Sequence, residues 1–404
     1  MQANTPNDQA LPEKFWTRSF TVILAIAFLT YANISVFFEF FAYLKTCPID
    51  PSWFGTLMGI FAGVSLLVRP LVIPFFQPGN ARSFLVLGTV LAILALGSYS
   101  LTRSLPGLMG VRIFHGLAFV VMGAALTALM MPHVPKGGSA RFFGIISIVV
   151  LIPNTLVPPL LPFLTRVLGG LPGVLLGFAG LSALIFLLLP LVPKNAADGP
   201  RHKDQHLKLS RKEIMANLTD PKVVLLLLAM LCLYCGHALV FFFLDGFSRE
   251  LDIPNAGLFL TLSTVGEIGI RLFAGKAMDR APKDRLLILV LTGLGLSFLL
   301  LGSLASLPQG LRLPLFYALG ALAGLGWGVA MPVFNGLMFD ISNQRLQSFN
   351  TNLGFQMFQA GFFIGPFLGS ALAGVAGFGP VFYLAALLSL AGVFMVGMFK
   401  RRNI

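Results

Sequence analysis

Long apolar segments recur along the whole chain, and they limit its possible folds more than any other feature of the sequence. Each has about 20 residues, the length that an α-helix needs to cross the core of a bilayer. Only helices and closed barrels satisfy every backbone polar group in lipid, and barrel strands would be shorter and would alternate in polarity. The sequence therefore predicts an all-α membrane protein with twelve transmembrane helices, near residues 19–44, 54–76, 83–102, 105–130, 142–165, 171–193, 223–247, 256–278, 286–306, 314–338, 351–376 and 380–399.

The composition supports a membrane protein and argues against several other classes. Of the 404 residues, 56% are hydrophobic and 11% are charged, whereas about 25% are charged in ordinary soluble domains. Three cysteines are too few to indicate a disulfide framework. No nucleophile, phosphate-binding loop or metal cluster is recognisable in the sequence. We therefore expect neither an enzyme nor a bound cofactor or metal.

The net charge of +13 is concentrated on one side of the predicted membrane. Twenty Lys and Arg residues lie in the termini and the loops on that side, and five lie in the opposite loops. By the positive-inside rule, this difference predicts that both termini are cytoplasmic. The basic character thus reflects topology, and nucleic acid is not an expected partner.

The only long polar stretch, residues 194–222, lies near the middle of the chain and predicts a linker between a first bundle (1–193) and a second bundle (223–404). The two parts resemble each other in sequence. At an offset of 208, Gly116 matches Gly324, and at an offset of 202, Arg69 matches Arg271. These matches predict two pseudo-symmetric six-helix bundles, with a substrate site between them near the bilayer midplane.

Ionisable residues within the spans are candidates for function because their insertion into lipid is costly. Glu39 is the predicted proton acceptor unless it is a solvated residue at a helix end, and Arg112 and His115 are its predicted partners in proton coupling. Glu267 and Arg271 are four residues apart, so they can form an ion pair on one helix face. That pair is either structural or exchangeable, binding an anionic substrate or a proton in one state.

Further polar and aromatic side chains within the spans are candidates for substrate binding, although bonds between helices are an alternative role for each. The predicted substrate-binding residues are Tyr31, Asn33, Asn154, Tyr234, His237, Glu267, Arg271, Asn335 and Gln356. Prolines and glycines are expected to interrupt the fifth and eleventh helices, which suits a moving gate. The predicted gating residues there are Pro158, Gly365 and Pro366.

Two motifs resemble signatures of the major facilitator superfamily, and the resemblance covers the whole chain. The segment from Arg271 to Arg280 (RLFAGKAMDR) resembles the loop signature between the second and third helices of a bundle. The resemblance implies the major facilitator fold and a cytoplasmic latch formed by Arg271, Gly275, Asp279 and Arg280. The first bundle has Gln77 and Pro78 at the aligned positions, so a latch there is expected to be weak or absent.

Arg112-Ile-Phe-His115-Gly116 is similar to the fourth-helix signature of proton-coupled members of that superfamily. The chain most resembles the bacterial efflux permeases, which implies a bacterial inner membrane. The leading hypothesis is alternating-access, proton-coupled export of a drug-like compound or metabolite. Proton-linked uptake of an organic anion such as a monocarboxylate, and a membrane sensor or scaffold that does not transport, are the alternatives. The expected partners are a small-molecule substrate, protons and membrane lipids, and we expect a monomer.

Overall fold

The computed structural model describes residues 16–50, 53–135, 137–192, 209–254 and 256–401, except for the side chains of 38, 41, 42, 154, 155, 158, 159 and 245. Eleven of the described helices are long and apolar enough to cross a membrane. A further helix, α6, contains a shorter apolar stretch, Ser139–Pro153. The prediction of an all-α protein with twelve membrane helices is confirmed.

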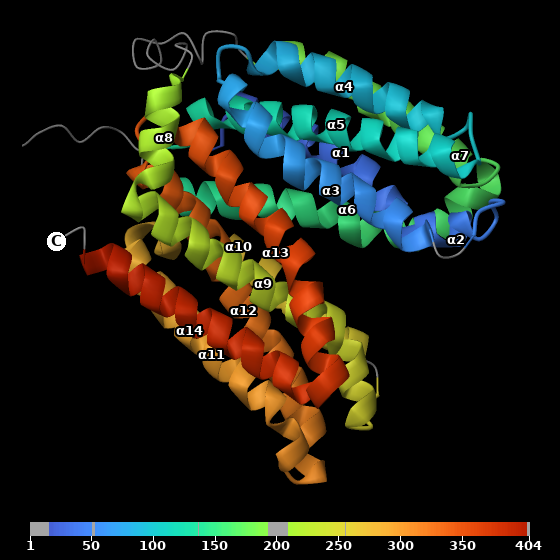
Figure 1. The fold of residues 1–404 in the computed structure, drawn as a ribbon. Coiled ribbons are helices and arrows are strands. Elements are labelled where there is room, and N and C mark those ends of the chain that lie inside the picture. Colours follow the sequence, from blue (N-terminus) through green and yellow to red (C-terminus); the bar gives the residue numbers. More distant parts are fainter. Residues whose placement is uncertain (1–15, 51–52, 136, 193–208, 255, 402–404) are drawn as a thin grey trace, which may run out of the picture.

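The helices form two bundles (Figure 1). The first contains α1 (Arg18–Ser35), α2 (Phe40–Leu44), α3 (Phe54–Val72), α4 (Ala81–Ser98), α5 (Leu105–Met130), α6 (Ser139–Val167) and α7 (Leu171–Leu188). The second contains α9 (Pro221–Glu250), α10 (Ala256–Arg280), α11 (Lys283–Gly302), α12 (Gln309–Ile341), α13 (Gln347–Ala376) and α14 (Gly379–Arg401). Short 3₁₀ turns extend several helices: η1 (Val36–Glu39), η3 (Ile73–Phe75), η4 (Met131–His133), η5 (Leu189–Leu191) and η8 (Leu304–Ser306).

The first predicted span is not one continuous α-helix. α1 ends at Ser35, and η1 separates it from the short helix α2. The Ser35 hydroxyl donates to the carbonyl oxygen of Tyr31 at 3.3 Å. Such bonds back to the preceding turn compete with the helical hydrogen bonds and bend helices. The sequence shows no proline or glycine between residues 32 and 44, so hydropathy alone did not locate this break.

The predicted linker contains a helix, α8 (Arg211–Thr219), while residues 194–208 lie outside the described part of the chain. Ser210 and Glu213 form a reciprocal capping box at its start, which satisfies two backbone N–H groups that have no helical partner. On α8, Ile214 packs against a hydrophobic cluster made mostly of first-bundle residues, and Asn217 exchanges hydrogen bonds with Asn350 of α13 at 2.7 and 3.1 Å. This helix therefore contacts both bundles.

Small residues set the closest approaches between helices. A Cβ atom added to Gly324 of α12 would lie 2.1 Å from the carbonyl oxygen of Ser263 in α10. A Cβ added to its repeat partner, Gly116 of α5, would lie 3.0 Å from Val64 in α3. Both glycines thus allow one helix to pack closely on another, as is common in membrane bundles. The two matched positions play the same packing role in the two bundles.

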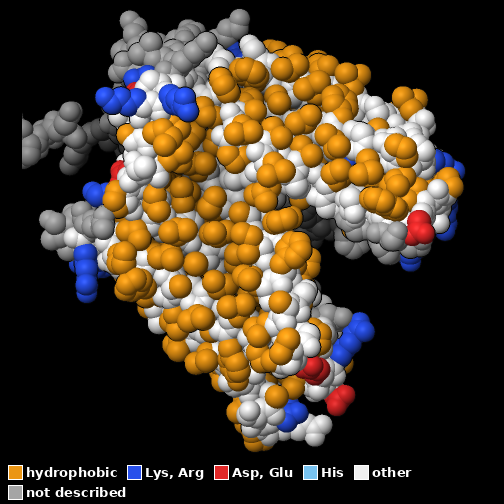
Figure 2. Space-filling view, viewed as in Figure 1, with side chains coloured by type: hydrophobic (Ala, Val, Ile, Leu, Met, Phe, Trp, Pro, Cys, Tyr) orange, Lys and Arg blue, Asp and Glu red, His pale blue; other side chains and the backbone are white. Residues whose placement is uncertain are grey.

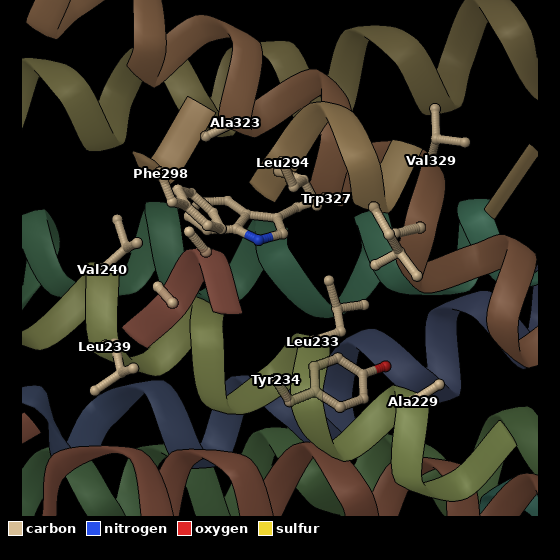
Figure 3. Packing of buried hydrophobic residues seen from close by; sticks show 14 of the residues in the cluster. Ala229, Leu233, Tyr234, Leu239, Val240, Leu294, Phe298, Ala323, Trp327 and Val329 are labelled. Atoms are coloured by element: carbon tan, nitrogen blue, oxygen red, sulfur yellow. The ribbon is translucent and has the colours of Figure 1, made fainter. Parts of the chain in front are cut away.

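Apolar side chains fill the interior of each bundle. In the second bundle, Figure 3 shows Phe298 and Leu294 of α11 beside Trp327 of α12, across from Leu233 and Tyr234 of α9. Figure 2 shows hydrophobic side chains over the visible flanks of both bundles, with Lys, Arg, Asp and Glu confined to their ends. This distribution is typical of a protein whose sides face lipid.

The bundles meet at one end and separate at the other (Figures 1 and 2). We call the end that carries α8 and the last turn of α14 the linker end, and the opposite end the open end. α6 packs against α10 and α12, and α13 packs against α3 and α5. These contacts between the bundles define two sides of the junction, an α6 side and an α13 side.

Candidate functional site

Glu267 and Arg271 form a buried ion pair on α10, as their spacing predicts. The Arg271 Nη2 atom lies 2.9 Å from Oε2 of Glu267, and the two side chains are 1% and 8% exposed. Arg271 also donates through Nε to the carbonyl oxygen of Gly328 at 3.2 Å and through Nη2 to that of Trp327 at 3.4 Å. α12 therefore helps to satisfy a charge that burial would otherwise make costly.

Several polar groups near this pair have no hydrogen-bond partner among the described residues. They include Nδ1 of His237, Nε1 of Trp327 and Oδ1 of Asn335. The rings of His237 and Trp327 stack with their centroids 4.0 Å apart. In Figure 3 the indole nitrogen lies on the edge of the ring that faces α9, which also carries Tyr234. The predicted residues Tyr234, His237 and Asn335 thus lie in the same bundle as the pair, together with Trp327, which was not predicted.

A second buried arginine, Arg69 of α3, joins the two bundles. Its Nη2 donates to Oδ1 of Asn352 in α13 at 3.0 Å, and its Nε has no hydrogen-bond partner among the described residues. One turn further along α13, Gln356 donates to the carbonyl oxygen of Leu66 at 2.8 Å. Gln356 is therefore at the interface between the bundles, where it joins two helices, and its role in substrate binding stays a prediction.

Arg112 of α5 lies among aromatic rings and carbonyl groups. Its Nε and Nη2 donate at 2.9 Å to the carbonyl oxygens of Leu57 and Met58. Its guanidinium carbon lies 4.8–5.1 Å from the centroids of three phenylalanine rings, within the range of cation–π attraction. The same side chain lines a cavity of about 220 Å³, together with Ile34, Phe37, Phe40, Met58 and Phe61.

The predicted proton-coupling residues do not form a connected cluster. Glu39 is the last residue of η1 and is partly buried. Among the described residues, no hydrogen bond or ion pair joins it to Arg112 or His115. His115 is 1% exposed, and its Nδ1 lies 3.4 Å from the hydroxyl of Tyr99. Their joint role in proton coupling stays a prediction.

The remaining substrate-binding candidates have different surroundings. Asn33 is 1% exposed, and neither polar atom of its amide has a partner among the described residues. Tyr31 packs edge-on against Phe119 at 6.2 Å. The side chain of Asn154 lies outside the described part of the structure, so its role stays a prediction.

On the α6 side of the linker end, a carboxylate of α10 binds the start of α6. Asp279, at the end of α10, accepts hydrogen bonds from the backbone N–H groups of Ala140 and Arg141 at 2.9 and 3.2 Å. These groups belong to the first turn of α6, where the helix dipole favours negative charge. A Cβ atom on Gly275 would lie 2.8 Å from Arg141, so a glycine is needed for this approach.

Of the four predicted latch residues, Gly275 and Asp279 contact the first bundle in this way. Arg271 pairs with Glu267 instead, and Arg280 is exposed with no polar contact in the described part of the chain. An unpredicted residue, Asp340 of α12, reinforces the same side of the junction. Its Oδ2 accepts from the Ser139 hydroxyl and pairs with Lys283, both at 3.0 Å.

The α13 side of the linker end has a weaker contact at the repeat-related position. There the Ser348 hydroxyl donates to the carbonyl oxygen of Phe76 at 3.3 Å. No described residue between 76 and 80 forms an ion pair with the second bundle. This arrangement agrees with the absence of the acidic latch residue from the first-bundle motif.

The two helices that were expected to be broken are continuous. α6 runs from Ser139 to Val167, and α13 runs from Gln347 to Ala376 with Pro366 inside it. The prediction of interrupted helices is therefore wrong, because neighbouring helices and side chains can satisfy the carbonyl groups that a proline frees. Gly365 packs against α9, where an added Cβ would lie 2.8 Å from Ala238. The side chain of Pro158 is outside the described residues, and the gating roles stay predictions.

Comparison with known proteins places this architecture in a family. The family model described as Major Facilitator Superfamily matches residues 19–353 and 226–403. No curated protein matches the chain in a sequence search.

Solved structures share its fold at low sequence identity. A bacterial homologue of the iron transporter ferroportin, in an outward-facing state, is 15% identical and has a TM-score of 0.77, over 96% of this chain and 100% of that chain. The human organic anion transporter MFSD10 is 15% identical, with a TM-score of 0.69 over 94% and 99% of the chains. FucP, in an outward conformation, is 14% identical, with a TM-score of 0.68 over 94% and 98%.

At these identities the structural matches establish the fold alone, whereas the family model covers nearly the whole chain. This fold supports secondary transport of small solutes. The two helical bundles and their repeat-related glycines are consistent with the family match. This chain belongs to the major facilitator superfamily.

Proposed function

We propose that the chain is a proton-coupled exporter of a small organic solute that works by alternating access. The observation that carries this proposal is the Glu267–Arg271 pair. Glu267 is the only buried carboxylate among the described residues, and its partner remains charged at any physiological pH. A pair of this kind can exchange a proton for a salt bridge, which couples solute movement to a proton gradient.

In this mechanism, protonation of Glu267 removes its charge and weakens its bond to Arg271. The guanidinium is still held by the carbonyl groups of Trp327 and Gly328. Those carbonyls belong to α12, which packs against α6 of the first bundle. Loss of the proton restores the pair, so the charge state of one carboxylate changes the contacts of a helix at the junction between the bundles.

The charge distribution supports a cytoplasmic linker end. The 20 Lys and Arg residues on the predicted cytoplasmic side include Arg18, Arg82, Lys283 and Lys400. With this orientation in a bacterial inner membrane, the present conformation has its cytoplasmic end closed and its opposite end open. Export then requires that the contacts of Asp279 and Ser348 break, so that solute can enter from the cytoplasm.

Inverted membrane vesicles with an acidic interior test the direction and the coupling together. An exporter accumulates solute in them, and Glu267→Gln abolishes accumulation but retains exchange of labelled for unlabelled solute without a gradient. Glu250→Gln, which removes an exposed carboxylate from the end of α9, is the matched control and should transport normally. Accumulation that does not depend on the proton gradient, in the wild type, contradicts proton coupling.

Proton-linked uptake of an organic anion is the second candidate, and the buried guanidinium of Arg271 favours it because a carboxylate solute can bind such a group bidentately. Uptake predicts the opposite result in the same vesicles: protons and solute leave together, and an acidic interior empties them. If no solute moves in either direction, the chain is better explained as a sensor or scaffold.

A further inference from the structure

The repeat places two arginines at equivalent positions but gives a counter-charge to only one of them. Arg271 of α10 corresponds to Arg69 of α3 at an offset of 202, and the same offset places Ser65 opposite Glu267. The second bundle therefore has a carboxylate one turn before its arginine. The first bundle has a neutral hydroxyl there.

The Arg69 site is buried and incompletely satisfied. Arg69 is 3% exposed and Ser65 is 0% exposed. Neither Nε of Arg69 nor the Ser65 hydroxyl has a hydrogen-bond partner in the described structure. The amide oxygen of Asn352, to which the guanidinium donates, is neutral. Burial of an uncompensated cation costs several kcal/mol, so this position is suited to a negatively charged occupant.

A second arginine in the same bundle also has no acidic partner among the described residues. Arg112 is 4% exposed, and the described groups around it include carbonyl groups, aromatic rings and the Tyr99 hydroxyl, with no carboxylate bonded to it among the described residues. It lines the cavity of about 220 Å³ that Phe61 also lines. Phe61, Ser65 and Arg69 follow one another at four-residue intervals, so they share one face of α3. The interior of the first bundle thus contains two buried arginines, on α5 and α3, and residues of both helices line the cavity.

We propose that Arg69 and Ser65 bind the negatively charged group of the transported solute, an organic anion with an apolar body. The carboxylate would accept from Nε of Arg69 and from the Ser65 hydroxyl, and the apolar body would lie against Phe61 and the other apolar residues of the cavity. Asn352 and Gln356 of α13 cover this site in the present conformation, and separation of α13 from α3 exposes it. This inference rests on the proposed transport function but not on its direction.

The anion site can be tested by introducing a carboxylate beside Arg69. Ser65→Glu places a carboxylate one turn before Arg69, as in the Glu267–Arg271 pair, and should compete with an anionic solute. Ser65→Gln is the matched control because it adds similar volume without charge. Arg69→Gln is a second variant that removes the cation and adds no bulk, in case a longer side chain at position 65 prevents folding. Each purified variant is first compared with the wild type by its thermal unfolding midpoint in detergent.

The probes are benzoate, salicylate and citrate, with benzamide and salicylamide as neutral counterparts and with phosphate and chloride as inorganic anions, all at one ionic strength. We expect at least one carboxylate to raise the unfolding midpoint of the wild type and to be exchanged across proteoliposomes, while its amide does neither. Ser65→Glu and Arg69→Gln should weaken that carboxylate's apparent affinity by about tenfold or more, because one partner of a desolvated charge pair is neutralised or lost.

Three results would overturn the inference. One is an equal response of the wild type, Ser65→Glu and Arg69→Gln to every probe, including no response at all. Another is a response to phosphate or chloride alone, which indicates an inorganic ion and not the solute. The third is an equal loss in Ser65→Gln and Ser65→Glu with no loss in Arg69→Gln, which indicates a steric effect. If the inference fails in one of these ways but the proteoliposomes still exchange a neutral or cationic solute for protons, the proposed transport function stands without the anion site.

Discussion

Gly324 shows how much of the structure depends on the absence of one side chain. It lies where α12 crosses α10, and the backbone of Ser263 occupies the space that a Cβ atom would need. Because backbone cannot rotate away as the end of a flexible side chain can, the two helices would have to move apart. Such a shift would disturb the neighbouring carbonyls of Trp327 and Gly328, which bind Arg271.

Gly324→Ala should therefore lower the stability of the protein by about 1–3 kcal/mol, the usual cost of overpacking a close contact. The thermal unfolding midpoint in detergent measures the change. Gly293→Ala on α11 is the control, since nothing lies within 4 Å of the position its Cβ would take. Equal midpoints for the two variants would show that α10 and α12 can separate at little cost.

Residue patterns predicted some parts of the candidate site and missed others for physical reasons. The spacing of Glu267 and Arg271 was sufficient because residues four apart always share a helix face. Contacts between helices have no such rule, so the sequence could not show that Arg112 binds carbonyl groups and not Glu39. Ser65 gave no signal of its own, since a serine in a membrane helix is common. Only the repeat offset, compared with Glu267, identifies its position as unusual.

At the scale of elements, α8 is the helix that the apolar pattern could not find. Hydropathy identified the membrane helices because their length and composition are set by lipid, whereas α8 is polar and is specified by the capping box of Ser210 and Glu213. It is held to the loop before α13 by an ion pair of 2.7 Å between Glu213 and Arg345.

Acid should release this helix. The Ser210 backbone N–H and hydroxyl, together with Arg345, lower the pKa of Glu213 below its ordinary value of 4.5. A carboxyl whose folded pKa is lowered contributes stability above its unfolded pKa and loses it as the pH falls through the folded value. We expect the amide hydrogens of residues 210–219 to exchange faster as the pH falls below 4.5, after correction for the intrinsic rate.

Hydrogen–deuterium exchange followed by mass spectrometry measures this effect in the intact protein. Glu213→Gln is the control, and its α8 should exchange faster at neutral pH with no further acid-dependent step. A step of the same size in Glu213→Gln would assign the acid sensitivity to another group.

At the scale of the whole molecule, the junction between the bundles is asymmetric. On the α6 side, the charged carboxylates of Asp279 and Asp340 contact the start of α6. On the α13 side, the contacts of Ser348 and Gln356 are bonds between neutral groups, and Arg69 donates to the neutral amide oxygen of Asn352. The first copy of the loop motif lacks the aspartate, and a weaker latch on that side stays a prediction.

Asp279→Asn should weaken the closed state of the linker end. Loss of a carboxylate at a helix N-terminus costs about 1 kcal/mol, or about a fivefold change in the ratio of closed to open molecules. Spin labels at Arg18→Cys and Arg401→Cys, with the native cysteines replaced by alanine, should report a larger fraction of long distances. Asp252→Asn, at an exposed residue of the open end, should leave the distances unchanged, and an unchanged distribution in Asp279→Asn would show that this carboxylate does not hold the end closed.

The α6 side and the α13 side of the junction are held by contacts of different strength, which affects the order in which they open during transport. Among the described residues, the α6 side has three bonds to the carboxylates of Asp279 and Asp340, and the α13 side has one charge-assisted bond, from Arg69 to Asn352. Because charge-assisted bonds are the stronger ones, α3 and α13 should separate first while α6 remains attached to α10. The two bundles would then rotate apart about a hinge along α6, and the first gap would open directly beside Arg69.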